Sequence, residues 1–292
     1  MTAAPLLVTH DHCLDGATCG VLGQAVGWEV AFVYPDGVEA YLRQVAPDRP
    51  VVLADVSLSL AAYPVYAERL LALIDHHQSA LGLRGLPRVH LDLDHCASTL
   101  LYRWLTATGR LDGSAAWDPL LALVEDYDLW RPDHVAGERL NRLFRDQGWE
   151  WFRTKFAAGY APLTPDEETR LAALEEEEHT FVARHLELAD RFQASGRRLA
   201  VVVLQGEGAV NEVAHALIQE GQDAAFLIKP DGRISCRTTG VVDAARLMER
   251  GFGGGGHPRA AGGRLPAESG WPRPDAVIWF KGRLQDLLTV SS

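Results

Sequence analysis

The stretch "LLALIDHH", residues 70–77, joins an apolar run to an aspartate and two histidines. The run is typical of a buried β-strand. Charged and imidazole groups at the edge of a hydrophobic core are costly unless something binds them. Asp75, His76 and His77 are therefore candidates for holding a ligand at the end of a strand.

Apolar runs that end in polar residues recur through the first half of the chain. They are "APLLVTH" (4–10), "WEVAFVYP" (28–35), "PVVLADVS" (50–57) and "RVHLDLDH" (88–95). Helix-like stretches lie between and after them, at 16–27, 36–46, 61–70, 97–109 and 115–130. This alternation predicts an α/β fold with a mostly parallel sheet flanked by helices. Ligands of such sheets bind outside the carboxyl ends of the strands, so we expect one group of residues to converge there: His10, Asp55, Asp75, His76 and His77.

The second half of the chain has a different character. A long charged helix is predicted over 165–193, and Thr164 with Glu167 resembles a capping box at its start. Further strands, helices, a hairpin and the glycine-rich loop "GFGGGGHPRAAGG" (251–263) predict a smaller C-terminal α/β domain. We expect a catalytic domain at 1–160, a helical linker at 161–194 and a second domain at 195–292.

Composition limits the classes of function. The 292 residues are 47% hydrophobic, as in a globular protein, and carry a formal net charge of −11. This charge argues against binding of long nucleic acid, which usually needs a basic surface. No apolar run or leader predicts a membrane segment or signal peptide, and the four cysteines show no CxxC pairing, so a cytoplasmic setting is expected. A homodimer is compatible with the sequence, which does not fix the oligomeric state.

Four segments carry candidate metal ligands: "THDHCLDG" (9–16), "LADVS" (53–57), "IDHH" (74–77) and "VEDYD" (124–128). A single aspartate after a strand is usually a helix N-cap, and a single histidine there usually fills a hydrogen-bonding role. Independent caps have no reason to fall at successive strand ends, so a metal site is favoured. Mixed carboxylate and imidazole ligands suit Mn²⁺, with other divalent ions as alternatives. Two ions about 3.5–4 Å apart would use this many ligands and suit phosphate-ester hydrolysis.

These motifs, in this order, resemble the DHH phosphoesterase superfamily, and "GFGGGGHPRAAGG" resembles the Gly-Gly-Gly-His motif of its DHH-associated C-terminal domain. The resemblance covers essentially the full chain and is greatest to the nano-RNases and the cyclic-nucleotide or dinucleotide phosphodiesterases. It implies that His10 binds one Mn²⁺ ion, that Asp55 bridges two and that His76 binds the second. His77 would face the scissile phosphate as a catalytic group, and Asp75 would orient the histidines. Asp126 or Asp128 would complete the coordination of the second ion, and Asp126 is ranked first.

The first motif departs from the family pattern of a histidine followed by two aspartates separated by one residue. Only Asp15 clearly fits, and the place of the other aspartate falls on Cys13 or Leu14. Asp11 or His12 could substitute, or Cys13 could be a soft metal ligand. The number and identity of the metal ions therefore stay open at this point.

The C-terminal motif has the composition of a phosphate site. Consecutive glycines, among them Gly254, Gly255 and Gly256, let backbone N–H groups approach an anion, although glycines alone also occur in plain flexible loops. The guanidinium groups of Arg237 and Arg259 suit bidentate phosphate recognition, and His257 lies between the glycines and Arg259.

The residues and the resemblance together predict a metal-dependent phosphodiesterase that cuts short oligoribonucleotides or dinucleotides to nucleoside 5′-monophosphates. One alternative is a phosphomonoesterase acting on 3′,5′-bisphosphorylated adenosine. The other is a nucleotide-binding sensor without catalysis, which only the altered first motif supports.

Overall fold

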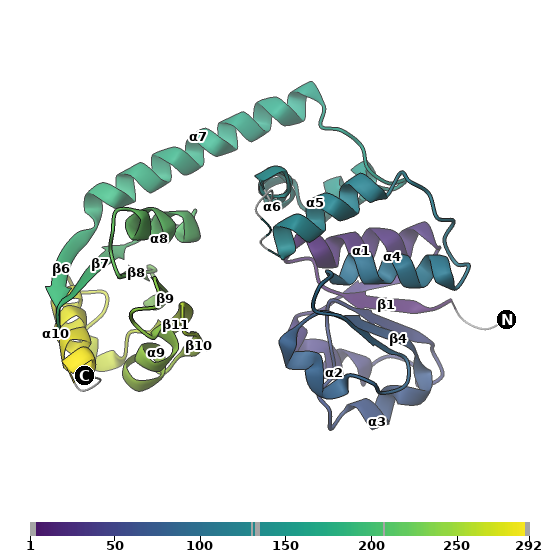
Figure 1. Ribbon diagram of the computed structural model, residues 1–292, viewed down its shortest axis with the longest axis horizontal. Coiled ribbons are helices and arrows are strands. Elements are labelled where there is room, and N and C mark those ends of the chain that lie inside the picture. The colour runs from purple at the N-terminus through teal and green to yellow at the C-terminus, as the bar shows by residue number, and fades with distance from the viewer. Residues whose placement is uncertain (1–3, 130, 132–134, 207, 290–292) are drawn as a thin grey trace. The chain divides into compact units, whose positions relative to one another are not determined.

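The chain forms two compact units, Met1–Leu171 and Ala172–Ser292. The structure is a computed structural model in which residues 4–129, 131, 135–206 and 208–289 are described. Each unit is built on its own sheet and is treated separately below (Figure 1). The helix α7 (Pro165–Leu188) begins in the first unit and ends in the second.

The first unit contains a five-stranded sheet in the order β2-β1-β3-β4-β5, with every pair parallel. Its strands are β1 (Leu6–Thr9), β2 (Glu29–Phe32), β3 (Val51–Ala54), β4 (Leu70–Asp75) and β5 (Val89–Leu91). Each strand falls within one of the five apolar runs of the sequence. The predicted α/β class and parallel sheet are confirmed.

Helices cover both faces of this sheet (Figure 1). One face carries α1 (Leu14–Ala25), α4 (Ala97–Ala107), α5 (Asp118–Asp128) and α6 (Val135–Lys155). The other carries α2 (Val38–Leu42) and α3 (Tyr63–Tyr66), with the short 3₁₀ turns η1 (Pro35–Gly37), η2 (Ala67–Arg69) and η3 (Gln78–Leu83) nearby. The helix α6, which is interrupted at Gly148, was not predicted from the sequence.

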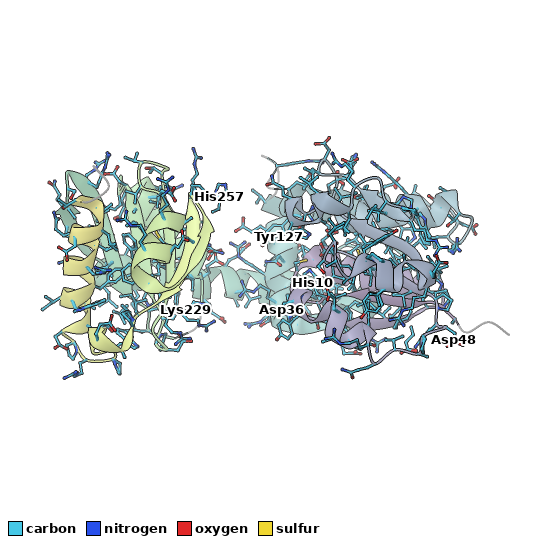
Figure 2. All side chains as sticks on the ribbon, turned by 90° about the horizontal axis from the view of Figure 1, so that it is seen from below. His10, Asp36, Asp48, Tyr127, Lys229 and His257 are labelled. Carbon is cyan, nitrogen blue, oxygen red and sulfur yellow. The ribbon has the colours of Figure 1, made fainter. Side chains whose placement is uncertain are left out.

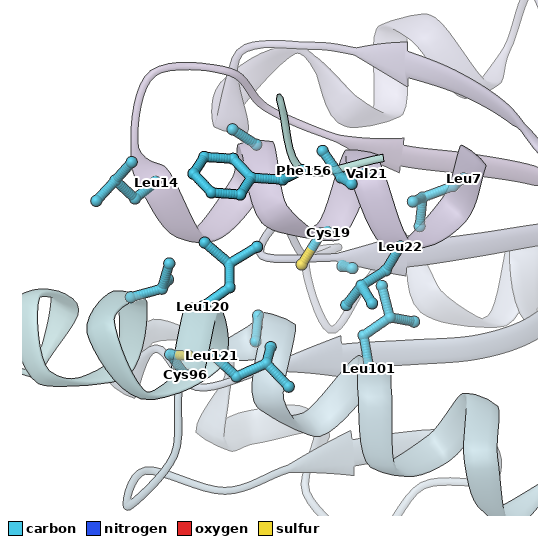
Figure 3. Close-up of a cluster of buried hydrophobic side chains, with 14 of the residues drawn as sticks. Leu7, Leu14, Cys19, Val21, Leu22, Cys96, Leu101, Leu120, Leu121 and Phe156 are labelled. Atoms are coloured by element: carbon cyan, nitrogen blue, oxygen red, sulfur yellow. The ribbon is translucent and has the colours of Figure 1, made fainter. Parts of the chain in front are cut away.

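The larger core of the first unit lies between the sheet and α1, α4 and α5 (Figure 3). Leu22, Leu101 and Leu120 come from these three helices and are fully buried. Phe156, just after α6, is buried in the same cluster. Burial of side chains of this size stabilises by about 1.5–3 kcal/mol each, which holds α1 and its first turn rigidly against the sheet.

The second unit has a six-stranded mixed sheet in the order β10-β11-β9-β8-β7-β6, in which only β7 and β8 are parallel neighbours. Its strands are β6 (Asp190–Ala194), β7 (Arg197–Val203), β8 (Ala224–Ile228), β9 (Arg233–Thr238), β10 (Gly255–His257) and β11 (Ala260–Arg264). The helix α8 (Val210–Gln219) and the end of α7 cover one face. The other face carries α9 (Ala244–Phe252) and α10 (Ala276–Thr289); η4 (Ala267–Ser269) is a short turn before α10.

Two predictions for this unit were wrong in detail. The helix expected over 165–193 ends at Leu188, and residues 190–194 form β6 instead, because they pair with β7 in an antiparallel hairpin. The expected glycine loop is largely the β10–β11 hairpin. The glycines permit its close packing, since a Cβ on Gly254 would overlap the carbonyl oxygen of Gly262.

No helix among the described residues is both long enough and apolar enough to cross a membrane.

Candidate metal centre

Three adjacent strands of the first sheet bring the site together. His10 directly follows β1, Asp55 directly follows β3, and His76 directly follows β4. Their order β1-β3-β4 places the three residues at one edge of the sheet. His10 Nε2 lies 2.9 Å from Asp55 Oδ2, and His76 Nε2 lies 3.4 Å from Asp55 Oδ1. The predicted convergence at the carboxyl ends of the strands is therefore present.

Asp55 occupies the middle of this group. Its backbone has a φ of 60°, the left-handed region that residues other than glycine rarely adopt. Such a conformation costs about 1–3 kcal/mol and persists only where the surroundings impose it. The side chain is buried, with one oxygen near each histidine. The carboxylate is thus positioned to be shared by two cations.

Three groups of described side chains have ligand atoms that lie within 4.8 Å of one another. They are His10–Cys13–Asp55, Asp55–His76–His77 and Asp15–His76–Asp128. Asp55 belongs to the first two groups, and His76 belongs to the last two. This overlap makes one continuous cluster with enough donors for two ions.

The buried nitrogen of His76 is the clearest sign that a cation fits. His76 Nε2 is buried and makes no hydrogen bond. It nevertheless lies 3.3 Å from Asp128 Oδ2, 3.4 Å from Asp55 Oδ1 and 3.7 Å from Asp15 Oδ2. Buried nitrogens without a partner are rare in proteins, and one surrounded by carboxylate oxygens fits a shared metal ion.

The charges in this cluster shift one another's pKa values. Burial alone would lower the pKa of His76, but the carboxylates of Asp55, Asp15 and Asp128 raise it to about 9. Burial and the neighbouring charges of Asp55 and Asp128 raise the pKa of Asp15 to about 7. Burial would also raise the pKa of Asp55, yet the interactions with His10 and His76 hold it below its usual range. The cluster therefore retains protons on His76 and Asp15 that a bound cation would replace.

Cys13 of the first motif lies among the candidate ligand atoms. Cys13 is the N-cap of α1, and its sulfur accepts a hydrogen bond from the backbone N–H of Gly16. The sulfur lies 3.3 Å from Asp55 Oδ2 and 3.7 Å from His10 Nε2. Asp11 and His12, which could have substituted, belong to none of the three groups. Of the residues of this motif that the sequence left open, Cys13 is the one whose side chain lies in a candidate ligand group.

Asp15 has a structural partner as well as a place in the cluster. Its two oxygens accept hydrogen bonds of 2.8 Å from the backbone N–H groups of Ala97 and Ser98 at the start of α4. A carboxylate at a helix N-terminus is favourable, because the unpaired N–H groups and the helix dipole are positive there. Asp15 is thereby fixed in orientation beneath His76.

Asp75 does not belong to the three groups and instead organises the turn that follows β4. Its Oδ1 accepts hydrogen bonds from the backbone N–H groups of His76 (2.7 Å) and His77 (3.2 Å). The same oxygen lies 2.7 Å from His77 Nδ1. The interaction with Asp75 raises the pKa of His77, and the His77 side chain is half exposed. With Nδ1 engaged by Asp75, Nε2 is the ring nitrogen that this contact leaves open.

The two aspartates of α5 differ in their surroundings. Asp128 lies in the cluster, whereas Asp126 belongs to none of the three groups and faces Arg131, with 3.4 Å between Oδ1 and Nη1. Ranking Asp126 above Asp128 was therefore wrong as a statement of geometry. Residues two apart on an α-helix project about 200° apart, so only one of the pair can face the strand ends.

A buried acid on α5, Glu125, was not predicted from the sequence. Glu125 is buried on α5 and lies 3.1 Å from His95 Nδ1 and 2.9 Å from Arg131 Nη2. Arg131 also donates to the carbonyl oxygen of Asp94. These contacts tie the end of α5, and hence Asp128, to the loop after β5. The only available signal was a second acid inside "VEDYD".

In the second unit, all the residues of the substrate-binding prediction lie on or beside the strands β9, β10 and β11. Arg237 pairs in register with Ala260, and Ala260 pairs with His257, so Arg237 and His257 project from the same face of the sheet. Arg237 Nη2 donates a 2.8 Å hydrogen bond to Asn211 Oδ1 on α8. Arg259 lies in the β10–β11 turn, where its backbone N–H reaches His257 Nδ1 at 3.3 Å. Asn211 was not singled out from the sequence, which offers no motif around it.

A parallel sheet that carries Asp-His-His at the end of β4, together with the glycine-rich hairpin, matches what the resemblance to the DHH superfamily implies. The DHHA1 domain family matches residues 198–278. The resemblance predicted from the sequence motifs is thus confirmed as a similarity: residues 198–278 match the DHHA1 domain family, and the chain is similar in sequence or fold to the relatives described next.

Individual relatives extend this match over nearly the whole chain. Oligoribonuclease NrnB of Bacillus subtilis is 29% identical over 88% of this chain and 71% of its own length. The pGpG-specific phosphodiesterase PggH of Vibrio cholerae has the same fold, with a TM-score of 0.67 at 14% identity, covering 99% of this chain and all of its own. The exonuclease RecJ, in a structure with bound manganese, has a TM-score of 0.62 at 16% identity, covering 98% of this chain and 90% of its own.

Proposed function

We propose that this protein is a metal-dependent phosphodiesterase that hydrolyses short oligoribonucleotides or dinucleotides to nucleoside 5′-monophosphates. The observation that carries the proposal is Asp55, whose two oxygens belong to two adjoining ligand groups at the sheet edge. A carboxylate shared in this way suits a pair of divalent ions and phosphate-ester hydrolysis. The similarity to NrnB and to PggH supports a short RNA or dinucleotide as the substrate.

The donor sets divide into two metal positions. His10, Cys13 and Asp55 would hold one ion, and Asp15, Asp55, His76 and Asp128 would hold the second. Mn²⁺ suits this mixture of imidazole and carboxylate donors, and RecJ binds manganese. When bound, the ions would lower the pKa of water for attack on phosphorus and neutralise charge on the phosphoryl oxygens.

The chain's own groups would supply orientation and a proton. Asp75 holds Nδ1 of His77, which leaves Nε2 to donate a hydrogen bond to the phosphate or the leaving oxygen. We assign phosphate binding to the second unit, through Arg237, His257, Arg259 and the backbone of Gly254, Gly255 and Gly256. The corresponding division is a catalytic domain at 1–160, a linker at 161–194 and a substrate-binding domain at 195–292.

We also propose a cytoplasmic location, which is supported by four cysteines that all remain free thiols. A homodimer stays a prediction that light scattering after size-exclusion chromatography would test.

The test is product analysis with the purified full chain, in Mn²⁺ or in EDTA. The substrates are an RNA dimer, a pentanucleotide, a long RNA, a cyclic dinucleotide and 3′,5′-bisphosphorylated adenosine. We expect Mn²⁺-dependent cleavage of the dimer and pentanucleotide, with the long RNA spared. Phosphate release from the bisphosphate alone would identify a phosphomonoesterase, and no turnover with bound Mn²⁺ would identify a sensor.

A matched pair of variants links turnover to the site. His76→Ala removes the central donor and is expected to abolish activity, while His90→Ala removes an exposed histidine on β5 and is expected to retain it. Full activity in His76→Ala would contradict the assignment.

A further inference from the structure

An exposed pair of rings lies beside the candidate metal centre. Tyr34 is 67% exposed, and its ring centroid lies 4.5 Å from that of His12. The His12 ring lies in turn 5.9 Å from the ring of His10, a candidate metal ligand. The three rings therefore form a short row that leads away from the metal position.

The fold holds Tyr34 at this place. Tyr34 follows β2, the neighbour of β1, and a hydrogen bond from Val33 N to Thr9 O continues the pairing of the two strands to their ends. Tyr34 is thereby placed at the same sheet edge as His10. Figure 2 shows Asp36, two residues farther on, at the His10 end of the unit, whereas Asp48 lies at the opposite end.

The exposure of Tyr34 is not explained by a structural contact. Its hydroxyl group makes no hydrogen bond within the described part of the chain. One side of the ring is backed by His12, which restrains it without burying it. An aromatic ring that is restrained and open to solvent beside a phosphate site is suited to stacking against a nucleobase.

We infer that Tyr34, backed by His12, is the stacking platform for one base of the substrate. The inference rests on the proposed function and names the part of the substrate that this sheet edge binds. Successive ring centroids in the row of His10, His12 and Tyr34 lie 5.9 Å and 4.5 Å apart, which places the platform near the candidate metal position. Because every base has a π-face, such a platform tolerates any sequence but requires a base.

The test uses the full chain and two readouts. Steady-state kinetics compare an RNA dimer with two dimers of the same length, one abasic at the 5′ nucleoside and the other at the 3′ nucleoside. We expect Tyr34→Ala to raise KM for the intact dimer about tenfold with little change in kcat, the size expected for loss of one base–aromatic stack. Tyr34→Phe should behave as the original protein, and one of the abasic dimers should lose its dependence on Tyr34.

Two outcomes of the kinetics would overturn the inference. One is a Tyr34→Ala effect of equal size on all three dimers, and the other is no effect on any. Tyr160→Ala is the control, since Tyr160 is an exposed tyrosine elsewhere in the same unit and should leave KM unchanged.

The second readout does not need turnover. A dimer containing 2-aminopurine is titrated with protein in EDTA, and stacking on Tyr34 should quench its fluorescence. Quenching that Tyr34→Ala abolishes would support the platform even if no dimer were hydrolysed, in which case only the proposed function fails. Quenching that persists unchanged in Tyr34→Ala would refute the platform.

Discussion

Asp55 has a strained backbone, little exposure and a different histidine beside each oxygen. Such strain is retained where the surrounding structure over-determines the conformation. The neighbouring candidate ligands are less unusual individually, and two of them, Cys13 and Asp15, are oriented by hydrogen bonds from backbone N–H groups. At the scale of single residues, the site can therefore be tested by removing one donor or one support at a time.

The first residue-scale prediction separates the two aspartates of α5. Asp128→Asn should weaken Mn²⁺ binding and reduce turnover at least tenfold, because it removes a donor facing His76 Nε2 at 3.3 Å. Asp126→Asn should have a clearly smaller effect, since Asp126 faces Arg131. Isothermal titration calorimetry with Mn²⁺ measures the affinity of each variant. A larger loss of affinity in Asp126→Asn than in Asp128→Asn would show that Asp126 is the metal ligand.

The second concerns the sulfur of Cys13. Thiolate favours Zn²⁺ and Co²⁺ over Mn²⁺, so Cys13→Asp should raise the affinity for Mn²⁺ relative to Zn²⁺. Protein loaded with Co²⁺ should show a sulfur-to-cobalt absorption band in the near ultraviolet that Cys13→Asp removes. Cys19→Ala is the control, because Cys19 lies in the apolar core and should keep the band. A band absent from the original protein would exclude Cys13 as a ligand.

The third concerns Gly16. A Cβ at this position would overlap the carbonyl oxygen of His10, and the Gly16 N–H supports the Cys13 sulfur. Gly16→Ala should therefore shift His10, lower metal affinity and destabilise the fold by about 1–3 kcal/mol, as overpacking does. Gly82→Ala, which has open space, should stay within about 0.5 kcal/mol of the original in urea unfolding.

At the scale of elements, the start of α7 shows how sequence and structure agree. The predicted capping box is confirmed: Glu167 N donates to Thr164 Oγ1 at 3.3 Å, and Thr164 N donates to Glu167 Oε2 at 2.7 Å. Lys155 Nζ and Trp151 Nε1 also donate to this carboxylate. One acid thus fastens α7 to the end of α6.

Removal of that acid should destabilise the first unit. Burial alone would raise the pKa of Glu167, but Lys155, Thr164 and Trp151 lower it to about 2. The stabilisation is present above the unfolded pKa, about 4.5, and is lost as pH falls toward 2. Glu167→Gln should cost about 1–2 kcal/mol at pH 7 in urea unfolding, with the difference from the original shrinking in acid. A difference that stays constant from pH 7 to pH 3 would contradict this reason.

At the scale of the whole molecule, the buried charges of the centre make the stability of the fold depend on metal binding and on pH. Folding raises the pKa of Asp15 from 3.8 to about 7 and that of His76 from 6.5 to about 9. The metal-free folded state therefore holds protons that the unfolded chain releases as pH rises. Stability must fall as pH rises through these windows.

The expected result is a melting temperature in EDTA that falls by several degrees between pH 6 and pH 9. Saturating Mn²⁺ should remove most of this fall, since a bound cation replaces the protons. Differential scanning calorimetry with and without Mn²⁺ is the measurement. A metal-free protein whose melting temperature rises with pH would show that other groups dominate the linkage.

The sequence by itself determined the local features. The apolar runs of β1, β3 and β4 became central parallel strands because their side chains can be buried on both faces of a sheet, and the polar residue after each of these runs was therefore carried to the same edge. The Asp-His-His turn and the Thr164–Glu167 box are likewise short-range patterns, in which spacing alone fixes the contact. The D-H-H motif and the glycine hairpin were enough to indicate the superfamily.

Only the tertiary structure decided which of two near-equivalent residues faces the centre. The rotation of α5 against the sheet decides that Asp128, rather than Asp126, lies in the cluster. The rotation of the start of α1 likewise selects Cys13 rather than Asp11 or His12. That rotation is set by long-range packing of residues such as Leu120 and Leu22, which no local spacing specifies. The same holds for the Tyr34–His12 pair and for Asn211 beside Arg237, since partners distant in sequence meet only when neighbouring elements pack.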